Sequence, residues 1–286
     1  MSDKLYNSSG VELNVGGGGE PVVGAAINYD TTLKSVAHRG LSSAAPENTI
    51  PAYRAAAAAG FHYVETDVQF TSDGVPVLLH NNRIDDTSNG VGEIVYMTYE
   101  TVRTYDFGSW FSADFTGTQI PNFDEFIVFC KQAMLHPYIE LKFSAFGYSS
   151  ASTTKIQMIV DKVEAAGMKG KVTYISFKDF YLSAVKDIDP DARLGLLFDC
   201  NSSGHFTDAL ITSASGLKTN TNEVFLDARG VNSTDIGMCK TAHIPLEVWI
   251  VDSASGVRGL DPYITGMTTN TLIGGKVLYD DALEDD

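Results

Sequence analysis

Short apolar runs rich in β-branched residues recur from Lys34 onward, and most are followed by segments whose apolar residues have helical spacing. The runs predict eight strands, over Ser35–His38, Tyr63–Val68, Pro76–His80, Tyr138–Lys142, Val172–Ser176, Arg193–Phe198, Val224–Asp227 and Leu246–Val251. Helices are predicted between them, over Thr49–Ala59 (with Asn48 as its cap), Asn122–Met134, Thr153–Ala166, Asp179–Asp187, Ser233–Ala242 and Ser253–Ile264. Eight strands alternating with helices predict an α/β fold, the (β/α)8 TIM barrel, although a doubly wound sheet would account for six or seven of them.

The segment after the third predicted strand interrupts this alternation. Residues 81–121 are rich in Gly, Asp and aromatic residues before the next predicted helix begins. A connection this long is either a small insertion or a disordered loop. The density of aromatic residues favours an ordered subdomain after strand three that covers one face of the barrel mouth.

The first 34 residues differ from the rest in composition and turn content. The glycine run Gly16–Gly19 predicts a flexible hinge. We therefore expect residues 1–34 to be an appendage or linker through which the protein could be attached. Residues 35–286 are expected to form the barrel. The start of the chain lacks a secretory signal pattern. No apolar run approaches the ~18 residues of a membrane span, so we expect a soluble chain.

Charge and cysteine content narrow the possible partners. Asp and Glu number 36 against 20 Lys and Arg, a formal net charge of −16. That balance argues against nucleic acid or an anionic membrane, so a phosphate ligand would need a locally positive site. Cys130, Cys200 and Cys239 are odd in number and form no Cys-x-x-Cys or Cys/His pattern, so we expect buried free thiols and no zinc site.

Ionisable residues gather where the first four predicted strands end, the position of the reactive residues in a barrel. Glu65 and Asp67 are two residues apart, as are Glu140 and Lys142, so each pair points to one face of its strand. Inward-facing carboxylates are costly unless compensated, and a hard divalent cation, Ca²⁺ or Mg²⁺, is the simplest compensation. His38, beside Arg39, and His80 would then flank the metal as acid/base candidates.

Each of these residues alone has a commoner structural interpretation. A single histidine at a strand end is usually hydrogen-bonded in the core, and Glu140 with Lys142 could be an internal ion pair. The succession of His, Glu-x-Asp, His and Glu-x-Lys on four strands favours a catalytic site. Trp249, on the last predicted strand, fits a core aromatic and a substrate-facing ring equally well.

The same residues carry a family resemblance. His38-Arg39-Gly40 followed by Pro46-Glu47-Asn48-Thr49 resembles the opening signature of the glycerophosphodiester phosphodiesterases. Further segments follow in that family's order: Glu65–Val68, Asp73–His80, Ile120-Pro121, Ile139–Lys142, Leu246–Trp249 and Gly266–Thr269. The resemblance covers roughly residues 36–278 and leaves the first 34 residues outside it.

The resemblance implies a (β/α)8 barrel with an insertion after strand three that hydrolyses glycerophosphodiesters to glycerol 3-phosphate and an alcohol, using one divalent cation. It implies that Glu65, Asp67 and Glu140 bind the metal and that His38 and His80 are the acid and base. Substrate contacts are expected from Arg39, Lys142 and Trp249. The substrate would be a small glycerophosphodiester or a glycerophosphate polymer. The chain departs from the family at three positions, Asn81, Asp86 and Asn270, where we expect effects on rate and substrate choice.

Two alternatives stay open at this point. One is phospholipase-D-like cleavage of lipid head groups, which the aromatic insertion would suit. The other is a barrel that binds phosphodiesters without turnover. Residues 5–10 are loosely similar to short leaders on bacteriophage tail-associated enzymes, so the expected location is cytoplasmic or associated with a virion or prophage.

Overall fold

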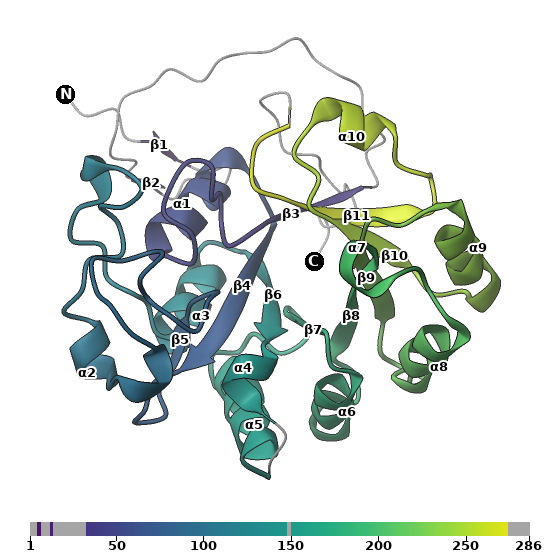
Figure 1. The fold of residues 1–286 in the computed structure, drawn as a ribbon, viewed down its shortest axis with the longest axis horizontal. Coiled ribbons are helices and arrows are strands. Elements are labelled where there is room, and N and C mark those ends of the chain that lie inside the picture. The colour runs from purple at the N-terminus through teal and green to yellow at the C-terminus, as the bar shows by residue number, and fades with distance from the viewer. Residues whose placement is uncertain (1–4, 7–11, 14–32, 148–149, 274–286) are drawn as a thin grey trace.

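A closed barrel of eight parallel strands forms the centre of the protein (Figure 1). The structure is a computed structural model and describes residues 5–6, 12–13, 33–147 and 150–273. Around the barrel, each strand pairs with the next, and β11 and β4 both pair with β3. The TIM barrel predicted from the sequence is therefore confirmed. Its strands are β3 (Lys34–Ala37), β4 (Tyr63–Phe70), β6 (His136–Leu141), β7 (Thr173–Ser176), β8 (Arg193–Asp199), β9 (Val224–Arg229), β10 (Leu246–Trp249) and β11 (Ile264–Thr269).

Helices surround these strands, as Figure 1 shows. The longer ones are α1 (Ile50–Ala59), α3 (Phe123–Gln132), α5 (Ser150–Ala165), α6 (Asp179–Ile188), α8 (Asp208–Gly216) and α9 (Ser233–Ala242). Local sequence sets several of their ends: capping boxes of Asn122 with Glu125 and of Asn232 with Asp235 start α3 and α9. Short helices α4 (Phe143–Phe146), α7 (Cys200–Ser203) and α10 (Ala254–Arg258) lie in the connections. Within the described residues, no helix is long and apolar enough to cross a membrane.

The predicted third strand is not part of the barrel. Its residues form β5 (Pro76–Leu78), which pairs antiparallel with the end of β4. Five residues, Thr71–Val75, connect the two strands. So short a connection allows a hairpin, whereas a parallel neighbour needs a crossover of roughly a dozen residues or more. The insertion therefore follows a hairpin strand and lies between the second and third strands of the barrel.

The eighth barrel strand was not predicted, and it begins at the last residue of a predicted helix. The predicted helix Ser253–Ile264 is only α10, and β11 begins at Ile264. The composition of β11, Ile-Thr-Gly-Met-Thr-Thr, lacks an apolar run, although five of its six residues are buried between neighbouring strands. Helix α8 was not predicted either.

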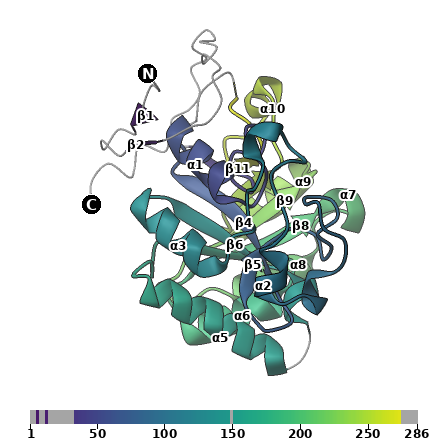
Figure 2. The same ribbon diagram turned by 90° about the vertical axis from the view of Figure 1, so that its left-hand side faces the viewer.

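The insertion is ordered, as its aromatic content predicted. It contains the 3-10 turns η1 (Ile94–Tyr96) and η2 (Ala113–Phe115) and helix α2 (Tyr99–Val102). In Figure 2, α2 is drawn next to β5. A separate hydrophobic cluster holds it together: Val77, Leu79, Ile84, Ile94, Val102, Phe107 and Ile120. Most of the predicted appendage lies outside the described residues. Its described parts, β1 (Leu5–Tyr6) and β2 (Glu12–Leu13), pair antiparallel and give no support for attachment.

A buried ion pair lies inside the barrel. Arg193 Nη2 lies 2.6 Å from Glu247 Oε1, and the Glu247 carboxylate also accepts a hydrogen bond of 3.1 Å from the Tyr138 hydroxyl. Glu247 is 2% exposed. Arg193 has a second partner, Glu223, whose side chain is 47% exposed. Part of the barrel interior is therefore filled by charged side chains that neutralise each other's charge.

Replacing Glu247 with alanine should lower the free energy of unfolding by roughly 3–5 kcal/mol, because Arg193 would lose its buried counter-charge. Urea unfolding of the two proteins measures this difference. Glu223→Ala is the matched control: it removes the exposed partner of the same arginine and should cost about 1 kcal/mol or less. Equal losses of unfolding free energy in the two variants would contradict the assignment of Glu247 as the buried counter-charge of Arg193.

Candidate active site

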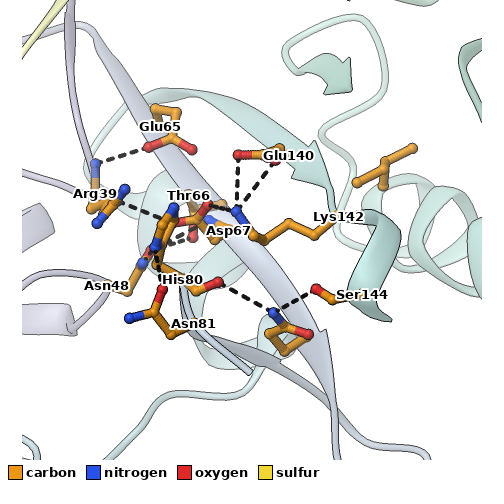
Figure 3. A network of polar contacts seen from close by, with 12 residues as sticks. Arg39, Asn48, Glu65, Thr66, Asp67, His80, Asn81, Glu140, Lys142 and Ser144 are labelled. Atoms are coloured by element: carbon orange, nitrogen blue, oxygen red, sulfur yellow. Dashed lines mark hydrogen bonds and ion pairs between the residues drawn. The ribbon is translucent and has the colours of Figure 1, made fainter. Parts of the chain in front are cut away.

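Four neighbouring segments bring their ionisable side chains together. Figure 3 labels most of these side chains: Arg39, Glu65, Asp67, His80, Glu140 and Lys142. Strand β4 carries Glu65 and Asp67, and β6 carries Glu140, with Lys142 immediately after it. The register sets Asp67 directly beside Glu140. His38 and Arg39 follow β3, and His80 lies just beyond β5. The structure thus brings together the seven ionisable residues expected at the ends of the first four predicted strands.

The three carboxylates form a compact cluster. Glu65, Asp67 and Glu140 each offer an oxygen, and these atoms all lie within 4.8 Å of one another. Glu65 and Asp67 are buried, and the Glu140 side chain is 12% exposed. Lys142 Nζ lies 3.0 Å from Asp67 Oδ1 and 3.4 Å from Glu140 Oε1, while Arg39 Nε lies 3.2 Å from Asp67 Oδ2. A set of hard oxygen donors at this spacing fits Ca²⁺ or Mg²⁺.

The electrostatics of the cluster also fit a cation. Burial, together with the neighbouring Asp67 carboxylate, raises the pKa of Glu65 well above its usual range. Burial raises the pKa of Glu140 to about 7, against the opposing effect of Lys142. For Asp67 the ion pairs with Lys142 and Arg39 outweigh burial and lower the pKa. The two cationic side chains therefore favour the ionised form of Asp67, and further positive charge at the site would favour the ionised forms of Glu65 and Glu140.

The two histidines have different surroundings. His38 Nδ1 lies 2.7 Å from Asn270 Oδ1, and its Nε2 lies 3.8 Å from Glu65 Oε2. Burial, reinforced by the Arg39 charge, lowers the pKa of His38 to about 4. His80 is only half-buried and its Nδ1 lies 2.8 Å from Asn81 Oδ1. Burial lowers the pKa of His80 as well, opposed by the Asp67 charge.

The loop from β3 to α1 is shaped to fit this cluster. Arg39 has a positive φ of 57°, and its backbone N–H donates to Glu65 Oε2 at 3.0 Å. Gly40 has a φ of 80°, and a Cβ there would lie 2.6 Å from the carbonyl carbon of Ala52. Only glycine fits so close an approach to α1. The Arg39 guanidinium is held by Glu47, with Nη1 3.0 Å from Oε1.

Sequence reasoning missed the part that asparagines play here. Asn48 was predicted to cap α1, but Thr49 occupies that position. The Asn48 amide instead donates to Asp67 Oδ2 at 2.9 Å, and its carbonyl accepts from the Tyr53 hydroxyl at 3.0 Å. The position of Asn48 within the Pro46–Thr49 segment, which resembles the family signature, was the one indication in the sequence that this residue belongs to the site. Asn270, noted as a departure from the family, holds His38 from the far end of the chain.

A cavity of about 300 Å³ opens beside the cluster. His38, His80 and Lys142 line one part of it, and Trp249 and Phe177 line another. The Trp249 indole is fixed by its N–H, which donates to the Asp227 carbonyl at 3.1 Å. Trp249 therefore lies in the cavity wall, with its ring positioned by the backbone of β9.

Solved structures share this fold. A glycerophosphoryl diester phosphodiesterase, described as putative, from Silicibacter pomeroyi superposes with a TM-score of 0.73 at 19% identity, covering 85% of this chain and 91% of that one. An Oleispira antarctica phosphodiesterase in complex with the product sn-glycerol-3-phosphate also gives 0.73, at 21% identity, covering 83% and 92%.

Sequence comparison leads to the same family. The model of the glycerophosphoryl diester phosphodiesterase family matches residues 38–263. A glycerophosphodiester phosphodiesterase of Bacillus subtilis is 28% identical over 260 residues, 86% of each chain. Another, from Caldanaerobacter subterraneus, is 32% identical over 165 residues, 58% of this chain and 66% of that one.

The fold and these matches define a barrel enzyme of the phosphoric diester hydrolase class. The chain belongs to the glycerophosphoryl diester phosphodiesterase family. This membership supports glycerophosphodiester hydrolysis as its activity.

Proposed function

We propose that this protein hydrolyses glycerophosphodiesters to glycerol 3-phosphate and an alcohol in a reaction that depends on one divalent cation and on two histidines. The observation that carries the proposal is the cluster of three carboxylates, within 4.8 Å of one another, beside a cavity lined by both histidines. Glu65, Asp67 and Glu140 would hold Ca²⁺ or Mg²⁺. Such a cation supplies charge neutralisation for the phosphate and for its transition state.

Arg39 and Lys142 bind and orient the phosphate in this proposal. Both side chains line the cavity and reach the carboxylate cluster, so their positive charges meet an anionic substrate where it reacts. Trp249 packs against an organic part of the substrate from the cavity wall. The global charge of −16 does not oppose this, because the local field at the site is set by these groups.

His38 is the base and His80 the acid of the first step. His38 is neutral at pH 7 because its pKa is about 4, so Nε2 can take the proton of the attacking oxygen, which we propose to be a glycerol hydroxyl of the substrate. His80 lines the same cavity and, with its ring protonated, donates a proton to the leaving alkoxide. The Asp67 charge favours that protonated ring, although burial lowers the pKa of His80 overall. The product would be a cyclic phosphate, and the two roles reverse when water opens the ring.

Product analysis with glycerophosphocholine tests the proposed reaction. The expected products are choline and glycerol 3-phosphate, preceded by a transient cyclic phosphate that ³¹P NMR can detect. Turnover restricted to lysophospholipids would instead support phospholipase-D-like cleavage. Binding of glycerophosphocholine without any turnover would make the protein a phosphodiester-binding barrel and contradict the proposal.

Calcium affinity should fall about tenfold or more between pH 7.5 and pH 6. Glu140 has a pKa of about 7 without the ion, and that of Glu65 is also raised, so protons compete with the cation for both carboxylates as the pH falls. Isothermal titration calorimetry at both pH values measures the change. Glu140→Gln should bind more weakly and show a shallower pH dependence, and an unchanged affinity between the two pH values would contradict the proposed ligands.

A further inference from the structure

A second group of side chains of types that bind metal ions lies outside the catalytic cavity. Cys200, His205 and Asp235 each offer one ligand atom, and these atoms all lie within 4.8 Å of one another. Cys200 opens α7 after β8, and Asp235 lies in the first turn of α9 after β9. None of the three lines the catalytic cavity. The group therefore has no part in the proposed reaction.

The Asp235 carboxylate is held in place before any ligand arrives. It is fully buried, and its Oδ1 accepts from the Phe206 backbone N–H at 2.8 Å. Its Oδ2 accepts from the Asn232 backbone N–H, also at 2.8 Å, as part of the capping box of α9. Backbone groups from two separate segments thus fix this side chain, which is the preorganisation that a metal ligand needs.

The other two groups face that carboxylate from the connection after β8. His205 Nδ1 lies 2.8 Å from Asp235 Oδ2 and 3.1 Å from Asn232 Nδ2. The Cys200 thiol is buried and makes no disulfide. The His205 side chain is 56% exposed, so an ion can reach the group from solvent on this side.

We propose that Cys200, His205 and Asp235 form a zinc site. A thiolate, an imidazole and a carboxylate are the mixed sulfur, nitrogen and oxygen set that Zn²⁺ prefers, whereas Ca²⁺ and Mg²⁺ favour oxygen alone. The two metal sites would therefore select different ions. Three protein ligands leave a fourth position for water, and the exposed edge of His205 gives it room.

Binding removes the proton of the Cys200 thiol and selects one tautomer of the His205 ring. The Cys200 thiol loses its proton to solvent and binds as the thiolate, although burial raises the pKa of the free thiol to about 11. The neutral His205 ring binds through Nδ1, so a proton that Nδ1 shares with Asp235 Oδ2 in the free protein moves to Nε2 by exchange with solvent. The exposed ring must swing slightly, because 2.8 Å between Nδ1 and Oδ2 is shorter than the ~3.3 Å that tetrahedral bonds of about 2.0 Å require. The ion would join α7 to the start of α9.

Cobalt(II) provides the direct test, using the full chain stripped of metal with EDTA and dialysed. One equivalent of Co²⁺ should produce the near-ultraviolet absorption of a thiolate-to-cobalt charge transfer together with tetrahedral visible bands. Cys200→Ser should abolish the charge-transfer band, and Cys130→Ser, which changes a buried thiol of α3, should keep it. No band in the wild type, or a band that survives Cys200→Ser, overturns the proposal.

A second measurement covers the case in which the buried cysteine variant folds poorly. Zn²⁺ should raise the Tm of the EDTA-stripped wild type in the presence of saturating Mg²⁺, and His205→Ala should lose that rise and bind zinc at least tenfold more weakly. His62→Ala is the matched histidine control and should keep the rise. An equal rise in Tm on adding Zn²⁺ to the wild type and to His205→Ala would overturn the proposed zinc site.

Discussion

Replacing Glu65 with glutamine should lower kcat for glycerophosphocholine hydrolysis by roughly 10³-fold or more. The substitution keeps the shape of the side chain but removes one of three negative charges that would hold the cation, and with it much of the charge stabilisation of the transition state. Glu65 also accepts the Arg39 backbone N–H at 3.0 Å, a contact that the glutamine carbonyl can preserve. Steady-state kinetics with saturating Ca²⁺ or Mg²⁺ give the change in kcat.

Glu164→Gln on the exposed face of α5 is the matched control, since it removes the same charge far from the site. It should leave kcat within about twofold, as surface substitutions away from special features usually do little. Calorimetry on Glu65→Gln should also show weaker metal binding. Wild-type activity in Glu65→Gln, with unchanged metal affinity, would remove this residue from the proposed ligand set.

Replacing either histidine with alanine should lower kcat by roughly 10²–10⁴-fold with a much smaller change in KM, because proton transfer rather than binding is lost. The two variants should differ in their response to the leaving group. A p-nitrophenyl diester of glycerol phosphate releases a stable phenolate that needs little protonation. His80→Ala should therefore regain most of its activity on this substrate, and His38→Ala should not.

His62→Ala serves as the control, because His62 does not line the catalytic cavity. It should retain kcat within about twofold on both substrates. Recovery of His38→Ala rather than His80→Ala on the activated substrate would exchange the acid and base. Full activity of both variants on glycerophosphocholine would contradict histidine catalysis altogether.

The central part of this site could be predicted from sequence because its chemistry is local to strand ends. Glu65 and Asp67 alternate within one β run, and Glu140 and Lys142 within another, so their shared face follows from strand geometry. The barrel architecture brings those faces together without any knowledge of long-range contacts. The apolar, β-branched runs that form the buried strands showed where each strand lies in the sequence.

The contacts that hold the site together could not be predicted in the same way. His38 and Asn270 are 232 positions apart in the chain, and they meet only because β11 closes the barrel onto β3. The polar composition of β11 concealed that strand. Asn48 looked like a helix cap because asparagine is common there, but its positive φ of 55° turns the side chain to Asp67 instead.

The proposed zinc site could not be predicted from the sequence for the same reason. Cys200 and His205 are near each other in sequence, but Asp235 joins them from another helix. No spacing motif spans that distance, and the absence of a Cys-x-x-Cys or Cys/His pattern in the sequence argued against zinc. A prediction of this group requires the packing of α9 against the connection after β8.

We infer that phosphodiester hydrolysis by this protein requires a divalent cation at Glu65, Asp67 and Glu140. The direct measurement is the rate of glycerol 3-phosphate release from glycerophosphocholine before EDTA treatment, after it, and after return of Ca²⁺ or Mg²⁺. We predict that EDTA abolishes turnover, that one of these ions restores it in the wild type, and that neither restores it in Glu65→Gln. Undiminished turnover in the EDTA-treated protein would contradict the claim.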